Sequence, residues 1–202
     1  MVVEIYRINV VLFNDFETLD VFGPVEIFGC VKEEFKMNFI SMDSGIITSS
    51  QGVKIQTDKY EYSPKYKEIL FIPGGAGTRK GVEDYKLLKY IKDISLNSKY
   101  ILTVCTGSAL LAKSGLLDGR EATSNKRAFN WVKEQSDKVL WIKEARWVKD
   151  GNIYTSSGVS AGIDMSLGFI SDILGRDVAL NICNRIEYIW NEDPKKDLFK
   201  VE

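Results

Sequence analysis

Short apolar runs rich in β-formers alternate with segments of helical spacing along most of the chain. Residues 8–13, 36–42, 68–72 and 100–104 have the composition of buried strands. Apolar positions recur with helical spacing in residues 19–28, 87–94, 108–113, 163–174 and 178–189. This alternation predicts an α/β fold, a flavodoxin-like three-layer sandwich with a mainly parallel sheet and helices on both faces.

Two hairpins are predicted beside these units. Residues 46–62 alternate around Gly52 and indicate an inserted hairpin. Residues 139–148 and 153–155 flank Asp150 and Gly151, a strong turn signal, and indicate a second one. No repeat or linker interrupts the order, so residues 1–202 are expected to form a single domain, with the polar segment 191–202 at its periphery.

Composition narrows the choice of partners. The chain has 27 Lys and Arg residues against 28 Asp and Glu, so no positive field favours nucleic acid, and no nucleic-acid partner is expected. No apolar run approaches the roughly 20 residues of a bilayer span, and the amino terminus lacks the pattern of a signal peptide. A cytoplasmic protein without membrane contact is therefore expected.

Cysteine and histidine usage constrains the chemistry. The three cysteines, Cys30, Cys105 and Cys183, form no CxxC pair, which favours free thiols in a reducing compartment. The chain has no histidine, so Ser-His-Asp or Cys-His machinery and histidine metal ligands are excluded within it. Neither a metal nor another cofactor is expected.

Cys105 is the candidate nucleophile. It follows a predicted strand and precedes a predicted helix, whose free N–H groups would stabilise a thiolate. Ligands of open α/β sheets bind at the carboxyl ends of the strands, where this residue is expected. The alternative is a buried structural cysteine.

Two further segments are expected near the same strand ends. Gly74 and Gly75 follow a buried strand and could offer backbone N–H groups to an oxyanion, although a simple tight turn explains them equally well. GGAGTRKG at residues 74–81 does not match a nucleotide-binding loop. Asp20 is either a helix-start residue or the proton shuttle of Cys105. Glu17 is expected to be solvated, and Ser160 either binds substrate or caps a helix.

Four motifs together resemble a known family. They are LDVFGPVEIF at residues 19–28, FIPGG at 71–75, VCTGSALLAKSGLLDGREAT at 104–123 and SGVSAGID at 157–164. The chain resembles the ThiJ/PfpI superfamily of the class I glutamine amidotransferase-like fold. Its most similar subgroup contains isonitrile hydratases.

The resemblance implies roles for particular residues. Cys105 matches the family nucleophile and Asp20 the acidic residue that contacts it, with Gly75 in the oxyanion loop. Thr106 follows the nucleophile as in the hydratases, and Val159 matches a pocket residue that contributes backbone contacts. Together they imply a cysteine-dependent hydratase or hydrolase of small molecules, in which thiolate attack is followed by water. An isonitrile would yield an N-substituted formamide.

Two positions depart from the family pattern. Protease-like members carry histidine directly after the nucleophile, and Thr106 at that position argues against peptidase or amidase activity. Many hydratase-like members carry histidine after EAT, where this chain has Asn125, which can bind substrate but cannot titrate.

Other functions remain open. Similar domains act as ligand sensors fused to helix-turn-helix DNA readers; since this chain stops at Glu202, regulation of that kind is expected to need a separate partner. A redox or stress-response protein would instead be oxidised at Cys105 without turnover. The resemblance also implies a homodimer.

Overall fold

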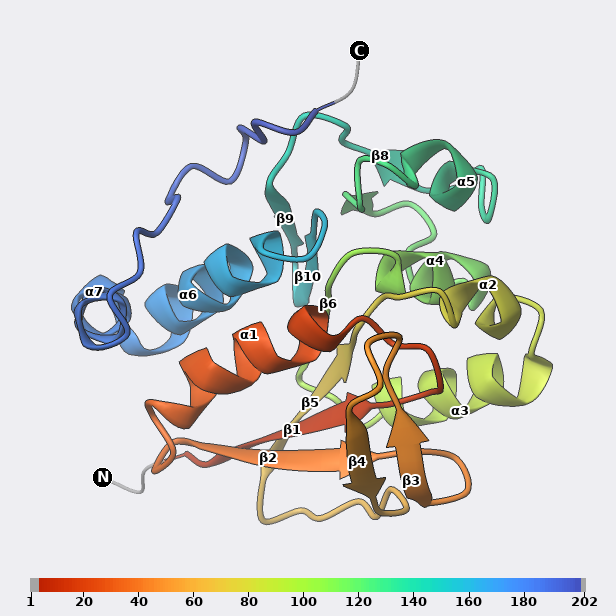
Figure 1. Cartoon of the computed structure of the whole chain (residues 1–202), viewed down its shortest axis with the longest axis horizontal. Coiled ribbons are helices and arrows are strands. Elements are labelled where there is room, and N and C mark those ends of the chain that lie inside the picture. The colour runs from red at the N-terminus through yellow and green to blue at the C-terminus, as the bar shows by residue number, and fades with distance from the viewer. Residues whose placement is uncertain (1–3, 201–202) are drawn as a thin grey trace.

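A six-stranded sheet forms the centre of the computed structural model, which describes residues 4–200 (Figure 1). Its order is β2 (Phe35–Ile40), β1 (Tyr6–Val11), β5 (Lys67–Ile72), β6 (Tyr100–Thr103), β10 (Ile153–Ser156) and β9 (Trp147–Asp150). The first five strands are parallel, and β9 runs antiparallel to β10. The predicted α/β sandwich with a mainly parallel sheet is confirmed.

Helices cover both faces of this sheet (Figure 1). One face carries α1 (Thr18–Gly29), α6 (Ala161–Leu174) and α7 (Arg176–Arg185). The other carries α2 (Thr78–Gly81), α3 (Tyr85–Ser95), α4 (Gly107–Lys113) and α5 (Phe129–Lys133). Among residues 4–200, no helix is long and apolar enough to cross a membrane.

Alternation along the strands builds a hydrophobic core on each face. In β5, Ile69 and Phe71 join the core beneath α1 and α6, whereas Leu70 and Ile72 join the core beneath α3 and α4. Successive side chains of a strand point to opposite faces, so a parallel strand covered on both sides must be apolar throughout. The carboxyl ends of β1, β5, β6 and β10 therefore meet at one edge of a rigid layer.

The predicted insertion is a hairpin of β3 (Gly45–Thr48) and β4 (Lys54–Thr57), which pair antiparallel. Gly52, with φ +86°, lies in its turn. Phe16 forms bridges to Ser49 in the hairpin and to Gly75 after β5. The Thr18 hydroxyl lies 2.7 Å from that of Ser49. The hairpin thus holds the start of α1 against the loop after β5.

The segment predicted as one strand over residues 139–148 is divided. β8 (Leu140–Trp141) pairs with β7 (Glu121–Ala122) in a separate small sheet, and the chain rejoins the main sheet only at β9. An alternating pattern does not distinguish one long strand from two short ones. Between them, the backbone N–H of Arg146 donates to the Pro194 carbonyl at 2.7 Å.

The last helix is shorter than predicted. α7 ends at Arg185, and Glu187 adopts a left-handed conformation with φ 54°. The N–H of Tyr188 then bonds back to the Cys183 carbonyl at 3.0 Å, a common way of closing a helix. Ile189, which the helical spacing includes in the apolar face, is 94% exposed.

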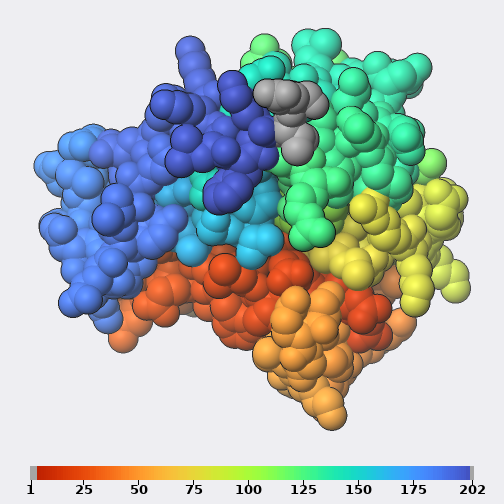
Figure 2. All heavy atoms as spheres, turned by 45° about the horizontal axis from the view of Figure 1, so that its top comes forward, coloured from red at the N-terminus to blue at the C-terminus, as the bar shows by residue number. Residues whose placement is uncertain are grey.

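The segment after residue 190 is not peripheral, because it carries a buried carboxylate back to the sheet. Asp197 is buried, and its Oδ1 lies 3.5 Å from Arg146 Nη1. Its Oδ2 lies 3.8 Å from Nζ of Lys126, which is also buried. Figure 2 shows this segment (blue) against the surface around residue 125 (green). The polar composition of the tail concealed this anchoring group.

Arg146 extends the network to the loop before α6. Its guanidinium lies 2.8 Å from Asp164 Oδ2 and donates to the Ser160 hydroxyl at 3.2 Å. Ser160 therefore binds Arg146, and its side chain makes no capping hydrogen bond to α6. Burial lowers the pKa of Lys126 to about 8, although the Asp197 carboxylate opposes this shift. Four buried charged groups, Lys126, Arg146, Asp164 and Asp197, thus join four segments that are distant in sequence.

We predict strong coupling between Lys126 and Asp197. Asp197→Leu alone leaves a buried ammonium without its carboxylate and should lower the free energy of unfolding by about 3 kcal/mol. The double variant Lys126→Met/Asp197→Leu should lose at least about 1 kcal/mol less than the sum of the two single variants. Urea denaturation of the four proteins measures this difference, and additive losses would show that the pair does not interact.

Candidate active site

Cys105 lies in a sharp turn between β6 and α4. Its φ is 59°, in the left-handed region that non-glycine residues seldom adopt. Its N–H lies 3.2 Å from the carbonyl oxygens of both Ser156 and Ser157, which anchors the turn to β10. A Cβ at Gly107 would lie 2.6 Å from the Ile72 carbonyl oxygen, so only glycine permits this packing. The sheet therefore presents the thiol at the end of β6.

Asp20 reaches the same place from the first turn of α1. The carboxyl group is buried, and its Oδ2 accepts a hydrogen bond from the Gly74 N–H at 2.8 Å. Its Oδ1 has no hydrogen-bond partner within residues 4–200. Burial raises the pKa of Asp20 to about 7; the Gly74 hydrogen bond lowers it, Glu17 raises it and Cys105 lowers it. The acid can therefore gain and lose a proton near neutrality.

Asn125 approaches the thiol from the segment between β7 and α5. Its Nδ2 lies 3.2 Å from Sγ of Cys105, and its Oδ1 accepts a hydrogen bond from the Ala128 N–H at 3.1 Å. The second bond fixes the orientation of the amide, so the NH₂ group faces the sulfur. A Cβ at Gly158 would overlap Asn125 Nδ2. Glycine at position 158 thus allows the amide to reach the thiol.

Val159 borders the thiol on the side of β10 and α6. Its φ is 44°, an unusual value for a β-branched residue. A hydrogen bond involving its backbone helps to lower the pKa of Cys105. This residue therefore contributes through its backbone, and the strain marks it as part of the site.

The glycine loop after β5 positions its neighbours. The Gly74 N–H is used by Asp20, and the Gly75 N–H donates to the Thr106 hydroxyl at 3.1 Å. The same hydroxyl lies 3.0 Å from that of Thr78. The structure does not support the expected oxyanion role of Gly74, whose N–H is engaged, and Gly75 could serve only by giving up its bond to Thr106.

The expectation of an easily ionised thiol is wrong for the resting protein. Burial, followed by repulsion from Asp20, raises the pKa of Cys105 to about 12. Hydrogen bonds with the Thr106 backbone, the Asn125 amide and the Val159 backbone lower it but do not offset these effects. The position of Cys105 before a helix is therefore not enough to predict its pKa, because burial and repulsion from Asp20 act in the opposite direction. The two groups titrate as a pair, and a thiolate forms most readily when Asp20 holds the proton.

A pocket of about 500 Å³ opens over the thiol. Sequence reasoning identified half of its wall, which consists of Gly75, Cys105, Thr106, Asn125 and Val159. It missed the other half, which consists of Glu17, Ala76, Arg79, Arg127 and Ala128. Glu17, expected to be solvated, is half-buried and lines the pocket. The signal for these residues was their position one to four residues from Asp20, Gly75 or Asn125.

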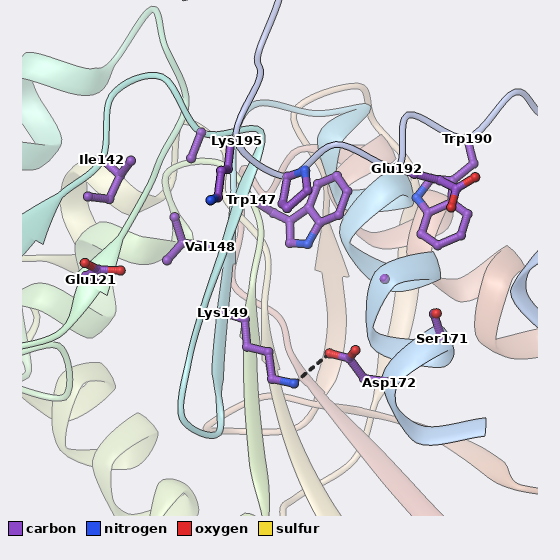
Figure 3. A pocket seen from close by; sticks show the side chains of 13 residues that line it. Glu121, Ile142, Trp147, Val148, Lys149, Ser171, Asp172, Trp190, Glu192 and Lys195 are labelled. Carbon is purple, nitrogen blue, oxygen red and sulfur yellow. Dashed lines mark hydrogen bonds and ion pairs between the residues drawn. The ribbon is translucent and has the colours of Figure 1, made fainter. Parts of the chain in front are cut away.

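A larger cavity of about 620 Å³ lies at the β9 edge of the sheet (Figure 3). Trp147 and Trp190 line it, and Lys149 and Asp172 form an ion pair of 2.9 Å within it. Its lining includes no cysteine, and within residues 4–200 no cluster of His, Cys, Asp and Glu could hold a metal ion. The candidate active site is therefore the smaller pocket over Cys105.

Comparisons with known proteins identify relatives of this chain. The family model described as the DJ-1/PfpI family matches residues 6–172. Isonitrile hydratase of Pseudomonas putida is 31% identical over 186 residues, which cover 90% of this chain and 78% of that protein. The HTH-type transcriptional regulator CdhR of Pseudomonas aeruginosa is 28% identical over 73% of this chain, but only 44% of the regulator is covered. The crystal structure of a THiJ/PfpI family protein from Pseudomonas syringae superposes with a TM-score of 0.77 at 27% identity, covering 96% of this chain and 79% of that one.

We predict that the reactivity of Cys105 follows the protonation of Asp20. Below pH 7 the pair is neutral; above pH 7 it carries one negative charge, part of which resides on sulfur, so the rate of alkylation by iodoacetamide should rise through about pH 7. In Asp20→Asn only the buried thiol titrates, and the midpoint should move above pH 8. Rates measured from pH 5 to 10 with peptide mass analysis test this, and identical profiles would contradict it.

We predict that Gly158→Ala weakens the contact between Asn125 and the thiol. The added methyl group displaces the amide, and losing one hydrogen bond to the developing thiolate should slow alkylation of Cys105 at pH 8 about fivefold. Gly29→Ala is the matched control, since a Cβ there meets no atom within 4 Å. Equal rates in both variants would show that the amide does not assist ionisation.

Proposed function

This chain belongs to the DJ-1/PfpI family, and we propose that it is a cysteine-dependent hydratase or hydrolase of small molecules, with isonitriles as the first candidate substrates. One observation carries the proposal: a thiol in a strained left-handed turn lies at a pocket, 3.2 Å from the Asn125 amide, and is coupled to Asp20. A nucleophile, a proton carrier and a hydrogen-bond donor are the groups that such a reaction needs.

The first step forms a covalent intermediate. The Cys105 sulfur attacks the electrophilic carbon, and the thiol proton passes through Asp20 to the substrate. For an isonitrile R–NC, the S–C bond forms at the terminal carbon, which also gains the proton, and the intermediate is the thioimidate R–N=CH–S–Cys. Asp20, with a pKa of about 7, can accept and return a proton at neutral pH.

Water completes the reaction. It adds to the thioimidate carbon while a proton reaches the nitrogen, and the C–S bond then breaks to release R–NH–CHO and regenerate the thiol. Asn125 donates a hydrogen bond to sulfur and stabilises its developing charge in both steps. Asn125 has no titratable proton, so in this mechanism the thiol proton is assigned to Asp20.

A ligand sensor without turnover is the second candidate. It is supported by the similarity of the chain to CdhR over 148 residues. The same pocket would then bind a small molecule, and the response would pass to a partner. The two candidates differ in one measurable property, because only the first releases a product.

We predict that the purified protein converts at least one member of an alkyl and aryl isonitrile panel to the corresponding formamide. Cys105→Ser should lower kcat/KM about 10³-fold or more, because a hydroxyl group cannot replace the thiol nucleophile. Liquid chromatography with mass detection follows the product. Cys30→Ser, which changes a thiol outside the pocket, should retain activity.

Formamide production that is unchanged in Cys105→Ser would overturn the mechanism. Saturable binding of the panel without any product would instead support the sensor.

A further inference from the structure

Two guanidinium groups line the pocket over Cys105. Arg79 belongs to α2, and Arg127 follows Asn125 by two residues. Within residues 4–200, neither side chain forms an ion pair or a hydrogen bond with another side chain. The walls of the pocket therefore hold two positive charges whose donors are available to a ligand.

Arg79 is held in place by an aromatic ring. Its guanidinium carbon lies 3.4 Å from the centroid of the Trp131 ring. Stacking engages the face of the guanidinium and leaves the N–H donors at its edge free. Thr78, the preceding residue, also donates a hydrogen bond to the Gly75 carbonyl at 2.7 Å. The short helix that carries Arg79 is thus tied to the loop beside the thiol.

The acidic residue of the pocket does not neutralise these charges. Oε1 of Glu17 accepts a hydrogen bond from Gln51 Nε2 at 2.9 Å, and it pairs with neither arginine. Asp20 is buried and does not line the pocket. The accessible wall therefore carries two cations and one anion.

We infer that this pocket takes substrates that carry a carboxylate, with Arg79 and Arg127 binding the carboxylate while Cys105 meets an electrophilic carbon a few atoms away. Planar N–H forks match the two oxygens of a carboxylate. A phosphate group would favour a nest of free backbone N–H groups, and here the N–H groups of Gly74 and Gly75 are already engaged. The chemical step rests on the proposed function, whereas the binding preference does not.

Two alkylating reagents of nearly the same size test the inference without any turnover. Iodoacetate carries a carboxylate, and iodoacetamide carries a neutral amide. In both cases the Cys105 sulfur displaces iodide, the S–CH₂ bond forms as the C–I bond breaks, and the thiol proton leaves to Asp20 and then to solvent. Peptide mass analysis assigns the modification to Cys105, and the ratio of the two second-order rate constants reports recognition of the carboxylate.

The ratio of iodoacetate to iodoacetamide rates should fall about tenfold in Arg79→Gln/Arg127→Gln, as expected for the loss of charge-assisted hydrogen bonds to a carboxylate. Lys80→Gln is the matched control, because it removes an exposed charge from α2 that does not line the pocket. Its ratio should match that of the wild type. An unchanged ratio in the double variant, or an equal fall in the control, overturns the inference.

Competition separates two kinds of anion. Propionate should protect wild-type Cys105 from iodoacetamide at lower concentrations than propionamide or inorganic phosphate do. Stronger protection by phosphate would overturn the assignment to carboxylates.

A binding measurement covers the case in which the thiol reacts with neither reagent. Saturation-transfer NMR on Cys105→Ser should detect chloroacetate more strongly than chloroacetamide, and the difference should disappear when both arginines are replaced. No difference in Cys105→Ser overturns the inference. A preference for carboxylates without isonitrile hydration would instead keep the binding assignment and discard the proposed hydratase.

Discussion

The left-handed backbone at Cys105 is the constraint on which the arrangement of the site depends. This conformation turns the chain from β6 into α4 so sharply that the thiol, although buried, lines the pocket. It is maintained from both sides, by the carbonyl groups of Ser156 and Ser157 and by the close packing of Gly107 on Ile72. The sheet on either side therefore stabilises a conformation that an isolated turn would not keep.

Burial gives this site its electrostatic character. Cys105 and Asp20 lie too close together and too far from water to be charged at the same time, and the pKa of each is raised. The pair therefore works with one negative charge and shares one proton. Two arginines at the pocket wall supply positive charge, which the buried pair of Cys105 and Asp20 lacks. Cys105 and Asp20 thus share a proton within the buried pair, while the arginines provide the charge of the binding surface.

Much of this arrangement could be predicted from the sequence, because strand ends and turn residues are local features. The parallel sheet, the inserted hairpin and the meeting of Cys105 with Asp20 follow from such signals, whereas Asn125 was expected at the site only from the family resemblance. The raised thiol pKa could not be predicted, because it depends on burial by residues that are distant in sequence. The same holds for Asp197, whose partners lie about 50 and 70 residues earlier in the chain. A polar segment gives no local sign of a buried partner.

The hairpin of β3 and β4 offers a way to change the pocket that does not involve the central sheet. It forms its own two-stranded sheet, which Asp58 joins to β2 by a bridge to Ile40, and it contacts Phe16 and Thr18 at the start of the helix that carries Asp20. A substitution in its turn can thus alter the mouth of the pocket without disturbing the central strands. Substitutions that would unfold the protein if they lay in the sheet can be tolerated in the hairpin. Substrate specificity can therefore change while the fold is retained.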